Sequence, residues 1–276
     1  MRHIQTKHQP DPRAEKAATV TSNVRARTVG DPFVQLSDRQ RRRLMRATAF
    51  HEAGHAAAAL LCGEGIYNIH IGVPETGFRI EDSRGRVRND IWGLAETTLS
   101  SEPPELIRAK LSAIPQMRGP IIANVFNNVF VDGAGPAAEA KHVHTSVAAV
   151  LLSGTASDDW EHSLESVEAL GYTAHEARKM VGEVWSATGR LVTGKRAWSA
   201  VTALAEAALS GRAGDDLDDI GLAHLPHAPV RPFGTPIYLP KALRSVWEQQ
   251  QAEWLAFNRD LEAAGPTSFV IEVARP

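Results

Sequence analysis

The chain has 276 residues, of which 43% are hydrophobic and 22% are charged, close to the usage of ordinary globular domains. This composition excludes a wholly disordered chain, and the formal net charge of −2 gives no reason to expect binding to nucleic acid or to anionic membranes. The single cysteine, Cys62, excludes an internal disulfide bond and a Cys-rich zinc ribbon.

No segment reaches the roughly 18 apolar residues that a membrane-spanning helix needs, and residues 1–30 lack the apolar core of a secretory signal. We therefore expect a cytoplasmic protein without a membrane span. Residues 1–36 are rich in Arg, Thr, Pro and Gln and poor in large apolar side chains. Such a segment buries too little apolar surface to fold by itself, so we predict a flexible N-terminal arm.

A long helix is predicted directly after this arm. Ser37 and Gln40 form a capping-box pattern, in which each side chain satisfies a backbone N–H at the start of the helix. The run that follows is dominated by Ala, Leu, Met and Arg, which are good helix formers. The helix is predicted to end at Cys62, because Gly63 can adopt the left-handed conformation that terminates a helix.

After this helix the spacing of apolar residues changes from a helical to an alternating pattern. Partial alternation of apolar and polar residues at 67–73 and again at 78–81 predicts one or two short strands or a hairpin. A helix is then predicted at about 104–118, with Gly119 and the proline after it as a break. The apolar segment 121–131 follows.

Helices dominate the rest of the central sequence. Ser157 is predicted to cap a helix that runs to about Leu170, with acidic residues in its first turn, where the helix dipole favours them. A second capping box, which starts at Thr173, opens a helix to about residue 187, and another helix covers about 195–210.

Residues 211–276 are predicted to contain an acidic loop at 211–219, a Pro-rich connector and a C-terminal helix at about 241–263. The predicted buried stripe of this helix consists of Leu243, Val246, Trp247, Trp254 and Leu255. Together these elements predict a mainly α fold with a small β hairpin element and a C-terminal helical extension.

One motif points to chemistry: His51-Glu52-Ala53-Gly54-His55, inside the first predicted helix. Residues four apart lie on one face of a helix, so both imidazoles can bind one zinc ion at about 2.0–2.1 Å. Glu52 lies beside them and can act as the general base that takes a proton from water. A catalytic zinc site also needs a third protein ligand. Spacing alone leaves this ligand open among Glu139, His142, His144, Asp158, Asp159 and His162.

A resemblance to a known family narrows this choice. The segment Ala47–Ala56 resembles the zinc-binding helix of the FtsH-type peptidases, peptidase family M41. Three further segments follow in the order of that family: Ala134–Glu139 looks like its "GGRAAEE" element, Gly154–Asp159 like its "TGASND" element, and Ala177–Val181 like its "AR-x-MV" helix. The matches span residues 43–186, about half of the chain.

The resemblance implies a zinc metalloendopeptidase of the HExxH type. In that family the aspartate that ends the third element is a zinc ligand, which makes His51, His55 and Asp159 the ligands expected here. Glu52 is then the catalytic base. Glu139 is expected to orient one of the ligand histidines.

The sequence also departs from that family. The FtsH-type proteases carry an ATPase module and usually membrane helices, whereas no G-x-x-x-x-G-K-[ST] motif is present here. The spacings from His55 to Glu139 and from Asp159 to Ala177 are longer than in the family. We predict that residues 37–210 form an M41-like zinc peptidase domain that hydrolyses peptides or flexible protein segments without ATP. Members of the family work as hexamers, but the motor largely organises that ring, so the resemblance leaves open whether this chain forms a homo-oligomer or works with a separate partner protein.

The alternative function is a catalytically silent, zinc-stabilised binding or regulatory module of the same fold. The missing motor and the altered spacings favour this alternative. The intact Glu52 argues against it, because a structural zinc needs no base. Hydrolysis of a non-peptide amide is a third interpretation that uses the same site.

Overall fold

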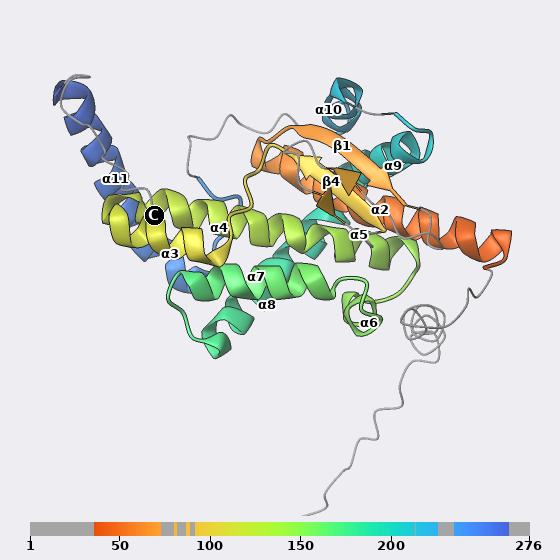
Figure 1. The fold of residues 1–276 in the computed structure, drawn as a ribbon, viewed down its shortest axis with the longest axis horizontal. Helices are drawn as coiled ribbons and strands as arrows, with labels where there is room; N and C mark the ends of the chain where they lie inside the picture. Colours follow the sequence, from red (N-terminus) through yellow and green to blue (C-terminus); the bar gives the residue numbers. More distant parts are fainter. Residues whose placement is uncertain are drawn as a thin grey trace, which may run out of the picture.

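The structure, a computed structural model, describes residues 36–72, 80–81, 87–88, 92–212, 214–225 and 235–264. The predicted N-terminal arm lies outside the described residues except for Leu36, and so does most of the predicted Pro-rich connector. Within the described residues the fold is mainly helical, with short antiparallel strands and a C-terminal helix (Figure 1), as the sequence predicts.

The long helix α2, Asp38–Cys62, forms as predicted. Ser37 Oγ accepts a hydrogen bond from the backbone N–H of Gln40, and the Gln40 side chain accepts one from the backbone N–H of Ser37 in return. Gly63 ends the helix with a φ of 87°, in the left-handed region. Both ends of the helix are therefore set by the residues that the sequence pattern singles out.

This helix runs through the middle of the described fold. Its second half is buried almost without interruption, from Ala49 to Leu61. It packs against α5, Ala134–His142, and against α9, Lys195–Leu209. Because α2 is covered on several sides, any side chain on its second half is held in a fixed position.

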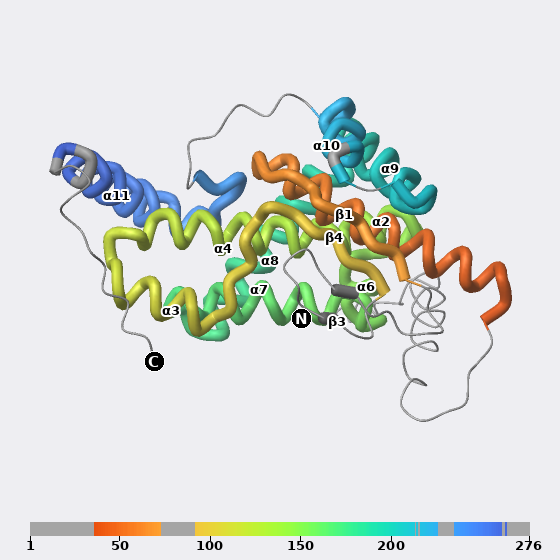
Figure 2. The backbone as a smooth tube through the Cα atoms, turned by 45° about the horizontal axis from the view of Figure 1, so that its top comes forward, coloured from red at the N-terminus to blue at the C-terminus, as the bar shows by residue number. Residues whose placement is uncertain are grey.

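Two short antiparallel strand pairs follow α2. β1, Ile66–Ile71, pairs with β4, Gly93–Thr97, and β2, Ile80–Glu81, pairs with β3, Val87–Arg88. The pair of β1 and β4 packs on α2 (Figure 2). The two predicted strand segments are confirmed where they are described. The sequence did not predict β4, because all its side chains are half-buried and no alternating face marks it.

The predicted helix at 104–118 is shorter in the structure. α3 spans Pro104–Ala113, a 3-10 helix spans Pro115–Met117, and α4 spans Arg118–Asp132. The predicted break at Gly119 is wrong, because Gly119 and the proline after it lie in the first turn of α4. Proline is tolerated there because the first N–H groups of a helix have no intrahelical partner.

Three further helices carry the chain back past α5. They are α6, Val147–Leu152, α7, Ser157–Ala169, and α8, Ala174–Val192. Ser157 is the first residue of α7 rather than its N-cap, and its Oγ donates to the backbone carbonyl of Gly154 at 3.1 Å. The predicted capping box of α8 is present, and α8 runs beyond its predicted end.

The predicted acidic loop at 211–219 is partly wrong, because Asp215–Leu222 form helix α10. Leu217 is fully buried and α10 packs against α9, so tertiary burial stabilises a helix that its acidic sequence does not favour. After the connector, a short 3-10 helix, Lys241–Leu243, leads into α11, Arg244–Ala264.

The predicted buried stripe of the C-terminal helix is only partly correct. Leu243 is buried, and Trp247 and Trp254 are half-buried. Val246 and Leu255, however, are 41% and 51% exposed. α11 packs mainly against α4 at one end of the molecule (Figure 1), so only a narrow side of it is covered.

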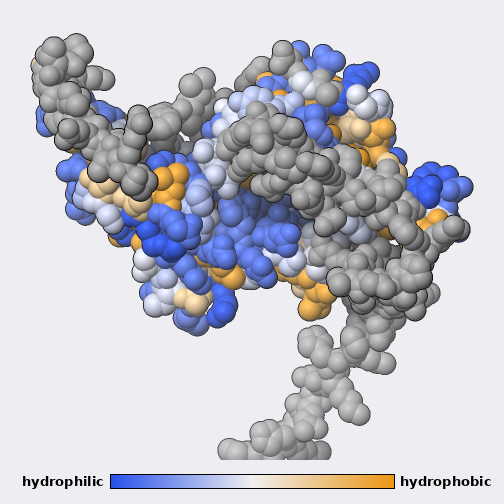
Figure 3. Space-filling model, in the orientation of Figure 1, coloured by the Kyte–Doolittle hydropathy of each residue, from blue (hydrophilic) through white to orange (hydrophobic). Residues whose placement is uncertain are grey.

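The core between these helices is made of large apolar side chains. The largest fully buried ones include Ile122, Phe126, Val129, Phe130, Val167, Val181, Val184, Val192, Val201, Leu204 and Leu217. On the face shown in Figure 3, hydrophilic residues gather across the centre, where α4, α5 and α7 lie in Figure 1. Within the described part of the chain, none of the helices has the combination of length and apolar character that crossing a bilayer requires.

Candidate metal centre

α2 presents two histidines, one turn apart, toward the same point. The ring centroids of His51 and His55 lie 4.8 Å apart. His51 Nδ1 lies 2.9 Å from Glu139 Oε2, and His55 Nδ1 donates to the backbone carbonyl of Val131 at 2.8 Å. These hydrogen bonds occupy the Nδ1 atoms and leave both Nε2 atoms for a metal ion, an arrangement common among zinc-binding histidines.

Asp159, in the first turn of α7, completes a group of three. Its Oδ2 lies 3.1 Å from His51 Nε2, and its Oδ1 lies 3.6 Å from His55 Nε2. The three candidate ligand atoms all lie within 4.8 Å of one another. Among the described residues this is the group of His, Cys, Asp and Glu side chains with the spacing to hold a metal ion.

The residue packed against the two rings has no side chain. A Cβ atom added at Gly135 would lie 2.7 Å from His51 Nε2 and closer still to His55 Nε2. Only glycine therefore fits at this position without displacing the rings. Two imidazole nitrogens and a carboxylate are a donor set that zinc takes, with zinc–nitrogen bonds of about 2.0–2.1 Å. The donor set therefore fits a zinc ion.

The close approach of α2 and α5 brings these groups together. A Cβ atom added at Gly54 would lie 2.5 Å from the Ala134 carbonyl oxygen and 2.8 Å from the Ala138 Cβ. Any side chain at Gly54 would push the two helices apart. Because Gly54 lies between the two histidines, this contact sets their distance from Gly135 and Glu139 on α5.

Glu52 is buried on the side of α2 that faces β4. A Cβ atom added at Gly93 would lie 2.5 Å from Glu52 Oε1, so the start of β4 lies directly against this carboxyl group. Burial raises the pKa of Glu52, while His51, His55 and a hydrogen bond from the backbone of Ala95 oppose the rise. A carboxyl group with a raised pKa beside a metal site can both accept and return a proton.

The charges of the site are strongly coupled. Burial disfavours a charged His51, but hydrogen bonds to Asp159 and Glu139 outweigh it and raise the pKa of His51 well above its ordinary value. Burial alone would raise the pKa of Asp159, whereas the interactions with His55 and His51 lower it. The metal-free site therefore favours a proton where the metal would lie, and a metal ion competes with that proton.

The other candidates for the third ligand lie elsewhere. His142 stacks on Phe50, with ring centroids 3.8 Å apart. His144 is exposed and sits in a turn with a φ of 58°. Asp158 is exposed and its Oδ1 accepts a hydrogen bond from Ser157 Oγ, and His162 bonds to Asp132 instead. The structure thus brings Asp159 to the Nε2 atoms of the histidines, and it brings Glu139 to Nδ1 of His51.

Two parts of the site were not predicted from the sequence. The Val131 carbonyl that holds His55 is a backbone group, and residue type gives no signal for it. Gly135 lies in the segment that resembles the family's second element, but its role depends on the crossing of α2 and α5. Neither contact follows from local sequence patterns.

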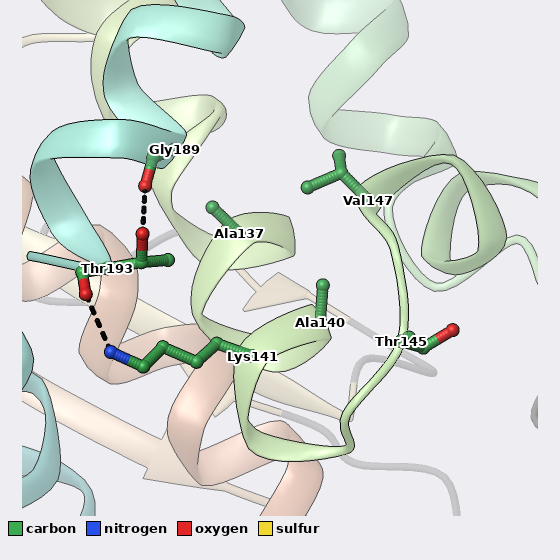
Figure 4. A pocket seen from close by; sticks show the side chains of 7 residues that line it. All are labelled: Ala137, Ala140, Lys141, Thr145, Val147, Gly189 and Thr193. Carbon is green, nitrogen blue, oxygen red and sulfur yellow. Dashed lines mark hydrogen bonds between the residues drawn. The ribbon is translucent and has the colours of Figure 1, made fainter.

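A shallow hollow lies on another face of α5 (Figure 4). It is lined by Ala137, Ala140, Lys141, Thr145, Val147, Gly189 and Thr193. Lys141 Nζ donates to the Thr193 carbonyl at 2.6 Å, and Thr193 Oγ1 donates to the Gly189 carbonyl at 2.6 Å. The Lys141 and Thr193 side chains are therefore bonded to neighbouring carbonyls, whereas the buried Thr145 Oγ1 has no hydrogen-bond partner among the described residues. None of the candidate metal ligands lines the hollow.

The chain matches no protein-family model, no curated protein and no solved structure. In the structure the site is a group of two histidines and one aspartate that could hold a metal ion, with a buried glutamate beside it.

Proposed function

We propose that this chain is a zinc-dependent metallopeptidase of the FtsH type, which hydrolyses peptide bonds in peptides or flexible protein segments without ATP. One observation carries the proposal: two imidazole nitrogens and a carboxylate oxygen lie within 4.8 Å of one another, with the buried carboxyl of Glu52 beside them. Two histidines and one carboxylate are a ligand set of catalytic zinc sites, which keep a position for water or substrate.

In this proposal His51, His55 and Asp159 hold the metal. Glu139 and the Val131 carbonyl fix the two rings through their Nδ1 atoms, which keeps each Nε2 lone pair available to the metal. Zinc, when bound, supplies a Lewis acid that polarises the peptide carbonyl and makes water more acidic.

Glu52 moves the proton. The attacking water forms a bond from its oxygen to the carbonyl carbon, and Glu52 accepts the proton that the water loses. When the carbon–nitrogen bond breaks, Glu52 returns this proton to the leaving amine. The raised pKa of Glu52, caused by burial, favours this return.

The start of β4 lies next to the proposed base, since Gly93 lies against Glu52. An extended peptide can bind to a protein by adding a strand to a sheet. A peptide added beside the start of β4 would pass close to Glu52. This supports flexible segments as substrates rather than folded proteins.

The central test replaces the base and keeps the ligands. We expect Glu52→Gln to lower hydrolysis of an unfolded protein chain by at least about 100-fold, the lower range of general acid–base effects, while zinc content stays at one ion per chain. Glu161→Gln, the same change at an exposed position of α7, is the matched control. Normal turnover in Glu52→Gln would show that another group is the base.

A second pair of variants tests the metal ligand. Asp159→Ala should lose zinc, as measured by elemental analysis after dialysis, whereas Asp158→Ala, the exposed neighbour, should keep it. Comparing an unfolded chain with a folded protein as substrates, without ATP, tests the substrate class. A wild-type protein that binds zinc tightly but cleaves nothing in a broad peptide screen is instead a zinc-stabilised binding module.

A further inference from the structure

The proposed reaction, on which this inference rests, builds negative charge on the carbonyl oxygen of the peptide bond that is cut. His51, His55 and Asp159 hold the metal, and Glu52 is the base, so none of them donates a hydrogen bond to that oxygen. Enzymes that stabilise such an oxygen commonly aim fixed hydrogen-bond donors at it. A protein donor for this oxygen has to come from another residue around the site.

His162 is the donor that the fold offers. It lies on α7, one turn after Asp159, and residues at this spacing are neighbours on one helix face with about 5–6 Å between their Cβ atoms. Its Nδ1 lies 2.9 Å from Asp132 Oδ2, and its Nε2 lies 2.9 Å from the Oγ of the exposed Ser101. Asp132 thus holds the ring through Nδ1, whereas Nε2 lies against the hydroxyl of an exposed serine.

Asp132 is itself held in place. Ser163 Oγ donates to the same carboxyl oxygen at 2.9 Å, and Trp185 Nε1 donates to Ser163 Oγ at 3.3 Å. The residue before Asp132 holds His55 through its backbone carbonyl. The anchors of His162 and of a metal ligand are therefore consecutive residues of α4, which fixes the two rings relative to each other.

The charge state of His162 suits a donor. In the metal-free protein the hydrogen bond to Asp132 has the largest effect on this ring and raises the pKa of His162, while burial opposes the rise. A higher pKa favours the imidazolium, in which both ring nitrogens are donors.

We propose that His162 is a catalytic residue of the metallopeptidase reaction, whose Nε2–H donates a hydrogen bond to the peptide carbonyl oxygen as charge develops on it. Asp132 is the positioning residue that holds the ring. The Ser101 hydroxyl occupies this direction in the free protein and gives way to substrate. His162 forms and breaks no covalent bond, and the proton taken from water still passes through Glu52 to the amine.

Hydrogen bonds also link Ser101 to His162 and His162 to Asp132, as in the catalytic triad of serine hydrolases, in which the serine is the nucleophile. In that case Ser101 itself would attack the carbonyl carbon. His162 lies one turn from Asp159, a proposed metal ligand, on the same face of α7. This position favours a role as hydrogen-bond donor in the metal-dependent reaction instead. Ser101→Ala distinguishes the two roles.

The experiment uses zinc-loaded protein and a phosphinic peptide, whose charged oxygen mimics that of the reacting carbonyl. We expect His162→Ala to lower kcat by about 10²–10³-fold, as for other single oxyanion donors, with a change in KM of only a few-fold. Affinity for the phosphinic peptide should fall by a similar factor, with zinc content unchanged. His162→Gln, whose amide can donate, should recover part of both losses. His175→Ala, at an exposed position of α8, is the control.

Asp132→Asn tests the positioning role in the metal-free protein. We expect the pKa of His162, followed by NMR, to fall toward its ordinary value, and the thermal unfolding temperature to fall mainly at pH values where His162 is charged in wild-type protein. A purely structural role of Asp132 would lower the unfolding temperature equally at all pH values and leave the pKa of His162 where it is. That result would remove Asp132 from the proposal.

Unchanged affinity of His162→Ala for the phosphinic peptide overturns the donor role, whatever happens to turnover. We expect Ser101→Ala to change kcat by at most a few-fold, and a loss as large as that of His162→Ala would make Ser101 the nucleophile. If wild-type protein cleaves no peptide, the proposed function fails, but the phosphinic peptide still decides the role of His162. Wild-type protein that binds zinc but not the phosphinic peptide overturns both.

Discussion

The contact of α2 with α5 and the core around α4 and α8 are built in opposite ways. The first depends on missing atoms, because Gly54 and Gly135 leave no room for a Cβ. The second depends on bulk, because Phe126 and Val184 are fully buried among other large side chains. Stability is therefore expected to come mainly from the second region, and the geometry of the metal centre from the first.

The largest expected effect separates stability from metal binding. Phe126→Ala should lower the free energy of unfolding by about 3–5 kcal/mol, the usual cost of removing a buried phenylalanine. The folded fraction should still bind one zinc ion per chain, because Phe126 is not part of the site. Urea unfolding and zinc analysis on the same samples measure both quantities. Loss of zinc from protein that is still folded would show that the two regions are not separable.

The opposite change tests the metal centre. Gly135→Ala places a methyl group 2.7 Å from His51 Nε2 and closer still to His55 Nε2, so the rings must move, and zinc affinity should fall by about 100-fold or more, at least as much as losing an orienting partner does. Competition with a chelating dye measures this affinity. Zinc binding as tight as in wild-type protein would mean that the two rings can move away from the methyl group without losing the metal.

The raised pKa of His51 predicts a pH dependence that the apolar core cannot produce. A group whose pKa is raised on folding contributes stability that is complete below its unfolded pKa, about 6.5 for histidine, and is lost as the pH rises through its folded pKa. The urea concentration at the midpoint of unfolding of the metal-free protein should therefore decrease as the pH rises above about 6.5, and zinc affinity should increase over the same range.

The variant His51→Gln isolates this contribution, because other groups of the site also titrate. Its urea midpoint should fall less than that of wild-type protein over the same pH range. Equal slopes for the two proteins would mean that the hydrogen bonds of His51 to Asp159 and Glu139 do not favour its charged form.

The smallest expected effect is the control for the glycine substitution. Gly182 is exposed in the middle of α8, and a Cβ added there meets nothing within 4 Å. Gly182→Ala should therefore raise the free energy of unfolding by roughly 0.5–1 kcal/mol, the difference in helix propensity. Zinc affinity should not change. A destabilising effect here would mean that the helix contacts something outside the described residues.

The two regions also differ in how far the sequence predicts them. The limits of α2 and the His51–His55 spacing are local features, so capping and helix geometry are enough to place them. Asp159 is 108 residues away from His51, and such a separation carries no geometric information by itself. The residues alone left six candidates for the third ligand, and the family resemblance was needed to choose one.

Other features depend on tertiary contacts that no local pattern records. β4 has no alternating face, and α10 is stabilised by the burial of Leu217 against its neighbours. The pairing of His162 with Asp132 joins two helices through side chains without a recognisable motif. The positions of these elements depend on how α2, α4, α7 and α9 pack together.

The end of α4 has a consequence for how the sequence of this protein can change. Two neighbouring positions there serve two rings: the Val131 carbonyl holds His55, and the Asp132 carboxylate holds His162. An insertion, deletion or tilt at this helix end would displace both rings at once. The positions of His55 and His162 therefore cannot change independently. A related sequence that keeps both rings in place must either keep this helix end in register or replace both hydrogen bonds together.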